Sequence, residues 1–187
     1  MSLLAFCEWL AATSGSIALH ESLYMYPLIE SVHVLALCIF VGLATILDLR
    51  LLNKVLRNVP VSQVADRLLP WTITGFVVMV MTGSLLFYAI PIRTYQSVWF
   101  RGKVIMLILA GINVWIFHSG IYQRVSGWDM AGRTPAAARR AALASLLLWF
   151  GIIVAGRFIA YNWFDCDIQP QSKFVNWFAG CIVPPAQ

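Results

Sequence analysis

Four long apolar runs, separated by short polar and basic connections, dominate the hydrophobic pattern of this chain. Each run is long enough for a helix to cross the hydrocarbon core of a bilayer, which takes roughly 20 residues. Backbone amides in lipid must be paired within their own segment, so these runs are predicted to be helices. The expected helices cover about residues 27–51, 71–92, 100–123 and 141–163.

The residues before Pro27 are too few and too polar to form a further span. Their large apolar side chains suit a helix that lies along the membrane surface. The side chains expected to face lipid are Leu3, Leu4, Phe6, Trp9 and Leu10. The fold class expected is therefore all-α, an integral membrane four-helix bundle with an N-terminal interfacial amphipathic segment. One transmembrane domain, residues 1–163, precedes a C-terminal tail, residues 164–187.

Composition agrees with a membrane protein and argues against a nucleic-acid partner. The chain is 60% hydrophobic and 11% charged, whereas soluble domains are about 45–50% apolar and about 25% charged. The net charge of +5 comes from basic residues in the short connections between apolar runs. Membrane orientation explains that placement, so the bilayer is the expected partner and nucleic acid is not.

The basic connections also predict orientation. Those after the first and third helices should be cytoplasmic; they carry Arg50, Lys54, Arg57, Arg67, Arg124, Arg133, Arg139 and Arg140. The connection between the second and third helices, with Arg93, Arg101 and Lys103, opposes this trend. The expected location is the inner membrane of a bacterium, with both termini and the tail in the periplasm.

Two cysteines in the tail are candidates for a disulfide. On this topology Cys166 and Cys181 lie in an oxidising compartment. A bridge between them would contribute about 3 kcal/mol on the chain-entropy estimate, and two unpaired thiols are the alternative. Trp177 and Phe178, which lie between these two cysteines in the sequence, suit the membrane surface.

Polar side chains from four helices converge at one depth near the outer ends of the spans. Glu30 and His33 are neighbours on one face of the first helix, and His33 lies about 9 Å below the outer edge of the hydrocarbon. Arg157 of the fourth helix lies at a similar depth, and Tyr161 is one turn further out. The other two helices contribute Lys103 and the sequence TGS at residues 82–84. Ionisable groups in a membrane are rare, so this convergence is the strongest functional signal in the chain.

His33 has two main interpretations. It is either a structural histidine bonded to Glu30 or a neighbouring helix, with Arg157 neutralising Glu30, or an axial ligand of a b-type haem. In the second interpretation Glu30 holds the other ring nitrogen, while Lys103 and Arg157 pair with haem propionates. Copper and quinone are further alternatives.

His118 is a second candidate metal ligand, placed in the opposite half of the membrane. It lies about 25 Å below the outer edge, roughly 16 Å deeper than His33. One haem iron must approach both of its ligands to about 2 Å, so a single haem between His33 and His118 is disfavoured. A histidine that caps the last carbonyls of its helix is the alternative.

The segments PLIESVHVLALCIFVGLATILDLRLL, WFRGKVIMLILAGINVWIFH and LLLWFGIIVAGRFIAY resemble a family of uncharacterised bacterial four-helix membrane proteins. More distantly, His33 and the Trp99–Lys103 spacing followed by His118 resemble copper-resistance D membrane proteins and HemJ-type protoporphyrinogen oxidases. The distant resemblance implies that His33 and Lys103 serve haem or porphyrin.

The leading functional hypothesis is a membrane-embedded b-type haem protein for electron transfer or for porphyrin or haem handling near the periplasmic face. With one well-placed histidine, the iron is five-coordinate or takes a ligand from a partner chain. The first alternative is a non-enzymatic membrane subunit, an anchor or assembly partner that binds a membrane or periplasmic protein or a second copy of itself. The second alternative is transport of copper or another metal ion. The sequence leaves open whether the protein is an enzyme.

Overall fold

The computed structural model describes residues 2–129, 134–161, 163–164 and 166–181. Over these residues the chain is helical and contains no strand, and four helical segments are long and apolar enough to cross a membrane. The predicted all-α membrane bundle is thereby confirmed. The elements are α1 (Leu3–Ala11), α2 (Ser14–Glu21), α3 (Met25–Leu51), α4 (Val61–Ala89), α5 (Pro91–Tyr95), α6 (Val98–Ile116), the π segment η1 (Phe117–Ile121), the 3-10 segment η2 (Tyr122–Gly127), α7 (Ala136–Ala160) and α8 (Lys173–Ala179).

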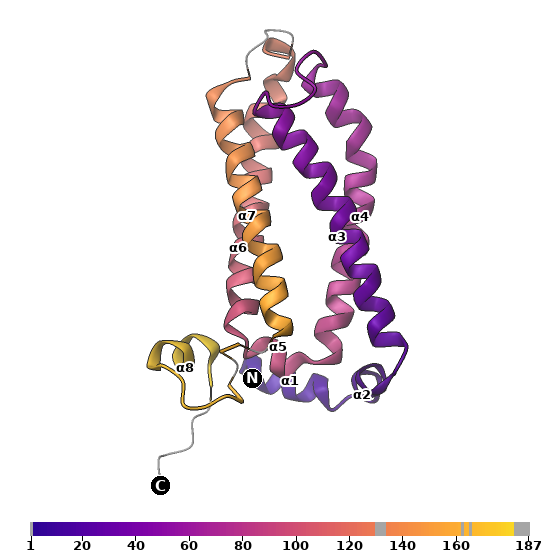
Figure 1. Ribbon diagram of the computed structural model, residues 1–187, viewed down its shortest axis with the longest axis vertical. Helices are drawn as coiled ribbons and strands as arrows, with labels where there is room; N and C mark the ends of the chain where they lie inside the picture. Colours follow the sequence, from indigo (N-terminus) through magenta and orange to yellow (C-terminus); the bar gives the residue numbers. More distant parts are fainter. Residues whose placement is uncertain (1, 130–133, 162, 165, 182–187) are drawn as a thin grey trace.

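The four long helices form two antiparallel hairpins, α3 with α4 and α6 with α7, which stand side by side in Figure 1. A shared apolar core joins them, and within it the rings of Phe40 on α3 and Trp149 on α7 meet edge to face, with centroids 4.7 Å apart. The other buried members of this core are Ala36, Met79, Ala110 and Ile152. Helix α7 therefore packs against α3 as well as against α6.

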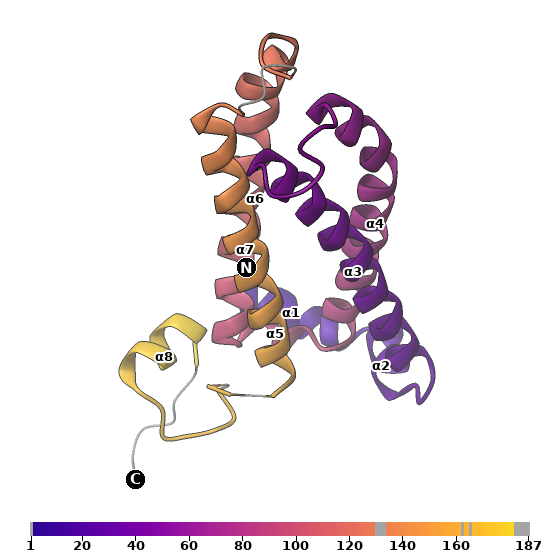
Figure 2. The same ribbon diagram turned by 45° about the horizontal axis from the view of Figure 1, so that its top comes forward.

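The two ends of the bundle are built differently. Helices α1, α2, α5 and α8 gather at one end, here named the α8 end (Figures 1 and 2). The opposite end, where α3 turns into α4, is named the loop end. A second apolar core lies there and includes Leu51, Val61, Phe117 and Ala138.

Helix α4 starts ten residues earlier than the expected boundary near residue 71. Val61, Val64 and Ala65 are buried, whereas Asp66 and Arg67 are exposed. This stretch is therefore an amphipathic extension of the span. Charge-free length measures the part of a helix that suits hydrocarbon, and it misses turns that continue beyond it. The other end of α4 is set by Pro91, whose ring begins α5 in a new direction.

The N-terminal segment forms two helices bent by 68°. Ser2 and Thr13 accept hydrogen bonds from backbone amides at the starts of α1 and α2, which is the usual N-cap arrangement. The large side chains Leu3, Phe6 and Trp9 are exposed along one side of α1, in keeping with the predicted lipid-facing set. Helix α1 packs against α5 on its other side.

Candidate functional site

His33 on α3 is held by a hydrogen bond to α4. Its Nδ1 lies 3.0 Å from the Thr82 hydroxyl oxygen, and that hydroxyl donates its own hydrogen to the Val78 carbonyl 2.7 Å away. A hydroxyl has one hydrogen to donate, so when Thr82 donates to Val78, the His33 tautomer that fits is the one in which Nδ1–H donates to Thr82. In the neutral ring, Nε2 then keeps its lone pair and is the nitrogen left to accept a proton or a metal.

A glycine on α4 makes room for this ring. A Cβ atom placed on Gly83 would lie 3.1 Å from Cε1 of His33, closer than ordinary packing allows. The imidazole therefore lies directly against the α4 backbone. Gly83 follows Thr82 in the sequence, so adjacent residues supply the hydrogen bond and the flat surface that orient the ring.

Lys103 on α6 lies against a glycine of its neighbouring helix α7, as His33 on α3 lies against a glycine of α4. Its Nζ lies 3.6 Å from where a Cβ of Gly156 on α7 would be. The side chain is partly buried and forms no hydrogen bond or ion pair with any other residue that the structure describes. It is close enough to His33 for the two to interact electrostatically. An ammonium group in an apolar bundle without an anionic partner is costly, which indicates a place for an anion.

Trp99, one turn before Lys103 on α6, was not predicted as a site residue. Its ring packs on Phe158 with centroids 4.5 Å apart. Its Nε1–H is buried and has no acceptor among the described residues. In the sequence, the Trp99–Lys103 spacing is notable only through the resemblance to HemJ-type and copper-resistance D proteins. The i, i+4 relation of two hydrogen-bond donors is the signal that would have placed them on one face of α6.

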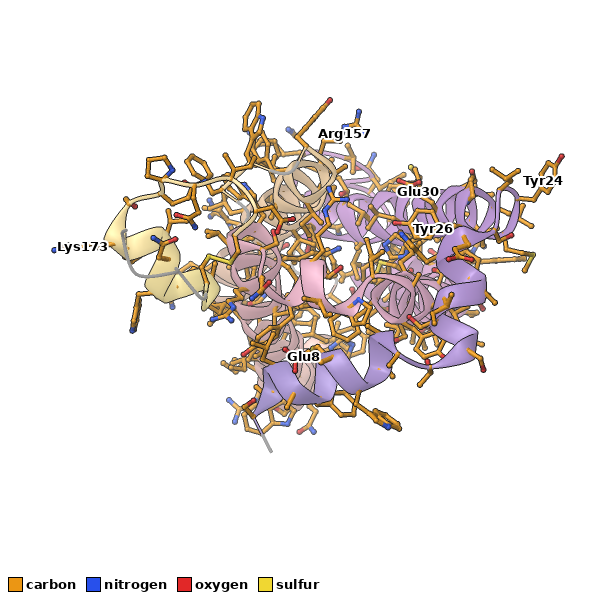
Figure 3. The ribbon with its side chains drawn as sticks, turned by 90° about the horizontal axis from the view of Figure 1, so that it is seen from below. Glu8, Tyr24, Tyr26, Glu30, Arg157 and Lys173 are labelled. Atoms are coloured by element: carbon orange, nitrogen blue, oxygen red, sulfur yellow. A yellow bond between two sulfur atoms is a disulfide. The ribbon has the colours of Figure 1, made fainter. Side chains whose placement is uncertain are left out.

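Glu30, Arg157 and Tyr161 lie outside the His33 contact. Figure 3 shows Glu30 on α3 and Arg157 on α7 in a view from the α8 end. All three side chains are exposed. Arg157 donates to the Tyr161 hydroxyl over 3.0 Å, and its guanidinium lies 4.9 Å from the centre of that ring. Glu30 is close enough to His33 for the two to interact electrostatically, as Lys103 is, while Thr82 supplies the hydrogen bond to the His33 ring.

His118 lies far along α6, in the π segment η1 towards the loop end, and is exposed. Its Nδ1 donates to the carbonyl of Val114 over 3.1 Å. This matches the interpretation of a histidine that binds a carbonyl near the end of its own helix. Within the described part of the chain, no three His, Cys, Asp or Glu residues lie close enough together to hold a metal ion.

The sequence as a whole was compared with known proteins. A family model, "Family of unknown function (DUF6644)", matches residues 6–162. The chain belongs to this family. No curated protein and no solved structure matches it. The matched residues include all four spans and the His33 and Lys103 positions, so the site described above lies within the part shared with the family.

Proposed function

We propose that this protein holds a b-type haem in the half of the bundle next to the α8 end, for electron transfer or for the handling of haem or porphyrin. The observation that carries the proposal is the His33–Thr82 hydrogen bond, which orients the ring through Nδ1. In the tautomer with the hydrogen on Nδ1, Nε2 keeps its lone pair. An imidazole that is oriented through one nitrogen and open at the other is the usual form of an axial haem ligand.

The donors on α6 complete the proposed site. Lys103 Nζ and Trp99 Nε1–H, which lack acceptors within the described residues, would donate to a propionate, and the lysine would neutralise its charge. Arg157, beside Tyr161 near the end of α7, would offer a second positive charge close to the surface. When bound, haem supplies an iron that changes oxidation state. The reduction potential of that iron depends on its axial ligand and on its surroundings. The resemblance of His33, Trp99 and Lys103 to the HemJ and copper-resistance D layout supports the same assignment.

The proposed location is the bacterial inner membrane, with the α8 end in the periplasm. Support comes from the basic residues, because positively charged connections remain on the cytoplasmic side. The loop end carries the larger set, which includes Arg50, Lys54, Arg57, Arg67, Arg124, Arg139 and Arg140.

The test is an absorption spectrum of the detergent-purified protein, produced with haem available, first oxidised and then reduced with dithionite. The expected result is a Soret band in the wild type that is lost in His33→Ala. His118→Ala is the matched control and should keep the band, because His118 bonds its own helix far from the site. A colourless wild-type protein would contradict the proposal.

A non-enzymatic membrane subunit is the second candidate, favoured by one observation. The His33–Thr82 hydrogen bond and the Gly83 contact join α3 to α4 without any ligand. If the wild type is colourless and His33→Ala unfolds at a lower temperature, the histidine serves this helix contact. Native purification would then identify the neighbours.

A further inference from the structure

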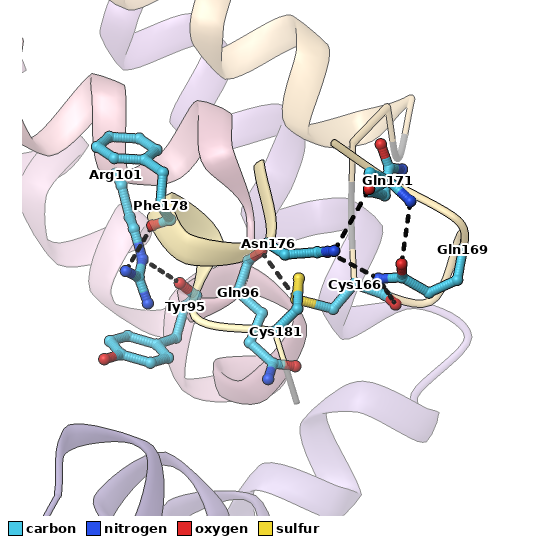
Figure 4. The surroundings of a disulfide bond; sticks show 9 residues. All are labelled: Tyr95, Gln96, Arg101, Cys166, Gln169, Gln171, Asn176, Phe178 and Cys181. Carbon is cyan, nitrogen blue, oxygen red and sulfur yellow. Dashed lines mark hydrogen bonds between the residues drawn. A yellow bond between two sulfur atoms is a disulfide. The ribbon is translucent and has the colours of Figure 1, made fainter. Parts of the chain in front are cut away.

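The tail after α7 is fastened to the α8 end of the bundle. Cys166 and Cys181 form a disulfide, the pairing that sequence analysis considered. Figure 4 shows Arg101, in the first turn of α6, bonded both to Phe178 at the end of α8 and to Tyr95 at the end of α5. Its Nη1 donates to the Phe178 carbonyl over 2.6 Å and its Nε donates to the Tyr95 carbonyl over 3.1 Å. The arginine thereby joins the end of α8 to the end of α5.

The backbone after α8 is shaped to accept this arginine. Gly180 has a φ of 69°, in the left-handed region where glycine carries no steric penalty. A Cβ atom at this position would lie 2.8 Å from Nη2 of Arg101. On the preceding loop, the Gln169 amide donates to the Asn176 side chain over 3.0 Å. One side of α8 is thus held in place by specific contacts.

The tail also exposes several large apolar side chains. Its exposed large side chains, here named the tail patch, are Trp163 (52% exposed), Phe164 (45%), Ile168 (50%), Phe174 (64%) and Trp177 (75%). Lys173 and Asp167 are the charged residues in the described part of the tail, and both are exposed. Five large apolar groups on a short, fastened segment indicate a surface that is covered by another phase or molecule.

The position of α8 indicates what covers it. In Figures 1 and 2, α8 lies beside the bundle, level with the ends of α6 and α7, rather than across the end of the bundle. It packs against α6, whose outward side chains Val104, Ile105 and Ile108 are exposed where lipid would surround a span. Lipid around α6 would therefore end at the level of the tail patch.

We propose that the tail patch docks on the headgroup region of the bilayer, so that the disulfide-closed tail is a second interfacial anchor in addition to α1. Tryptophan and phenylalanine beside a lysine are typical of such anchors, because the rings enter the boundary while the ammonium reaches phosphate groups. The anchor is tied through Arg101 to the turn of α6 that precedes Lys103. This proposal is independent of the haem.

The test measures which quencher reaches Trp177 in the full-length protein in nanodiscs. One preparation contains lipids brominated near the headgroup end of the acyl chains, and the other contains plain lipids with iodide in the water. Trp177→Phe keeps an exposed aromatic ring and removes one fluorophore. Trp115→Phe is the matched control, because Trp115 is 70% exposed on the membrane-spanning part of α6.

The expected result is that Trp177→Phe removes emission that brominated lipid quenches, as Trp115→Phe does, and leaves the iodide-quenched emission unchanged. Loss of iodide-quenched emission would place the tail patch in water and overturn the proposal. No change with either quencher would mean that protein covers the patch, which overturns it equally. Trp163→Phe repeats the measurement at a second position, and mass analysis of the unreduced Cys166–Cys181 peptide checks that the tail is intact.

Discussion

Two basic side chains in opposite halves of the bundle, Arg50 and Lys103, differ in how completely they are hydrogen-bonded. At the loop end, Arg50 is 5% exposed, and its Nε donates to the Val59 carbonyl over 2.7 Å while Nη1 donates to Asn53 over 3.0 Å. In the half of the bundle near the α8 end, Lys103 has no hydrogen bond or ion pair with a described residue, and Trp99 Nε1–H is buried without an acceptor.

On the proposed function, this difference distinguishes polar side chains that stabilise the fold from donors that would bind a ligand. A buried charged group whose hydrogen bonds are made within the chain stabilises the fold around it. Donors that lack acceptors lower stability unless something binds them, and such groups concentrate at functional sites. One loop-end group departs from the rule. Asp48 has a hydrogen bond to Ser145, but its Oδ2 has no partner among the described residues.

The largest expected effect belongs to Arg50. Arg50→Met should lower the free energy of unfolding by roughly 3 kcal/mol, because two hydrogen bonds from a charged donor are lost and the Val59 carbonyl is left without its donor. The measurement is unfolding of the purified protein in mixed micelles. Lys54→Met, which changes an exposed side chain in the same connection, should stay within about 0.5 kcal/mol of wild type. Equal stability of the two variants would remove the contrast between the ends.

Two glycine substitutions test whether packing against α4 matters for the His33 site. Gly83→Ala places a methyl group 3.1 Å from the His33 ring, whereas Gly111→Ala meets nothing within 4 Å. We expect the first variant to be about 2 kcal/mol less stable than the second. We also expect the first to disturb the Soret band if haem is bound. Similar stability and spectra for both variants would show that the His33 ring does not depend on the flat surface of α4.

The smallest change in stability is expected for Lys103. Lys103→Met removes a partly buried charge without removing a hydrogen bond within the described residues, so the unliganded protein should unfold at the same free energy or up to about 1 kcal/mol higher. Haem retention should fall in the same variant. A clear loss of stability in the unliganded protein would mean that Lys103 is structural, as Arg50 is.

The positions of the spans follow from the sequence, and the contacts within the site do not. Apolar run length predicted four helices, and the rise per residue predicted that His33, Thr82, Lys103 and Arg157 share one level. All four lie in the same half of the bundle, since His33 bonds Thr82 and Lys103 Nζ lies beside Gly156, which directly precedes Arg157. Periodicity, however, assigns a face within one helix only. Glu30 is therefore a neighbour of His33 along α3, while the partner that bonds its ring is Thr82 of α4.

Sequence by itself determined that this protein is helical, that four of its helical segments are long and apolar enough to cross a membrane, and at what level along those segments its polar groups lie. These properties depend on the cost of unpaired backbone and charge in lipid, which each segment meets alone. Tertiary structure decided the rotation of each helix about its axis. That rotation decided in turn that Trp99 Nε1–H and Lys103 Nζ lack an acceptor among the described residues and that Glu30 and Arg157 are exposed. The rotation of each helix follows from close packing at residues such as Gly83 and Gly156, where the lack of a side chain leaves room for a side chain of another helix. That room has an effect only once the helices are packed together.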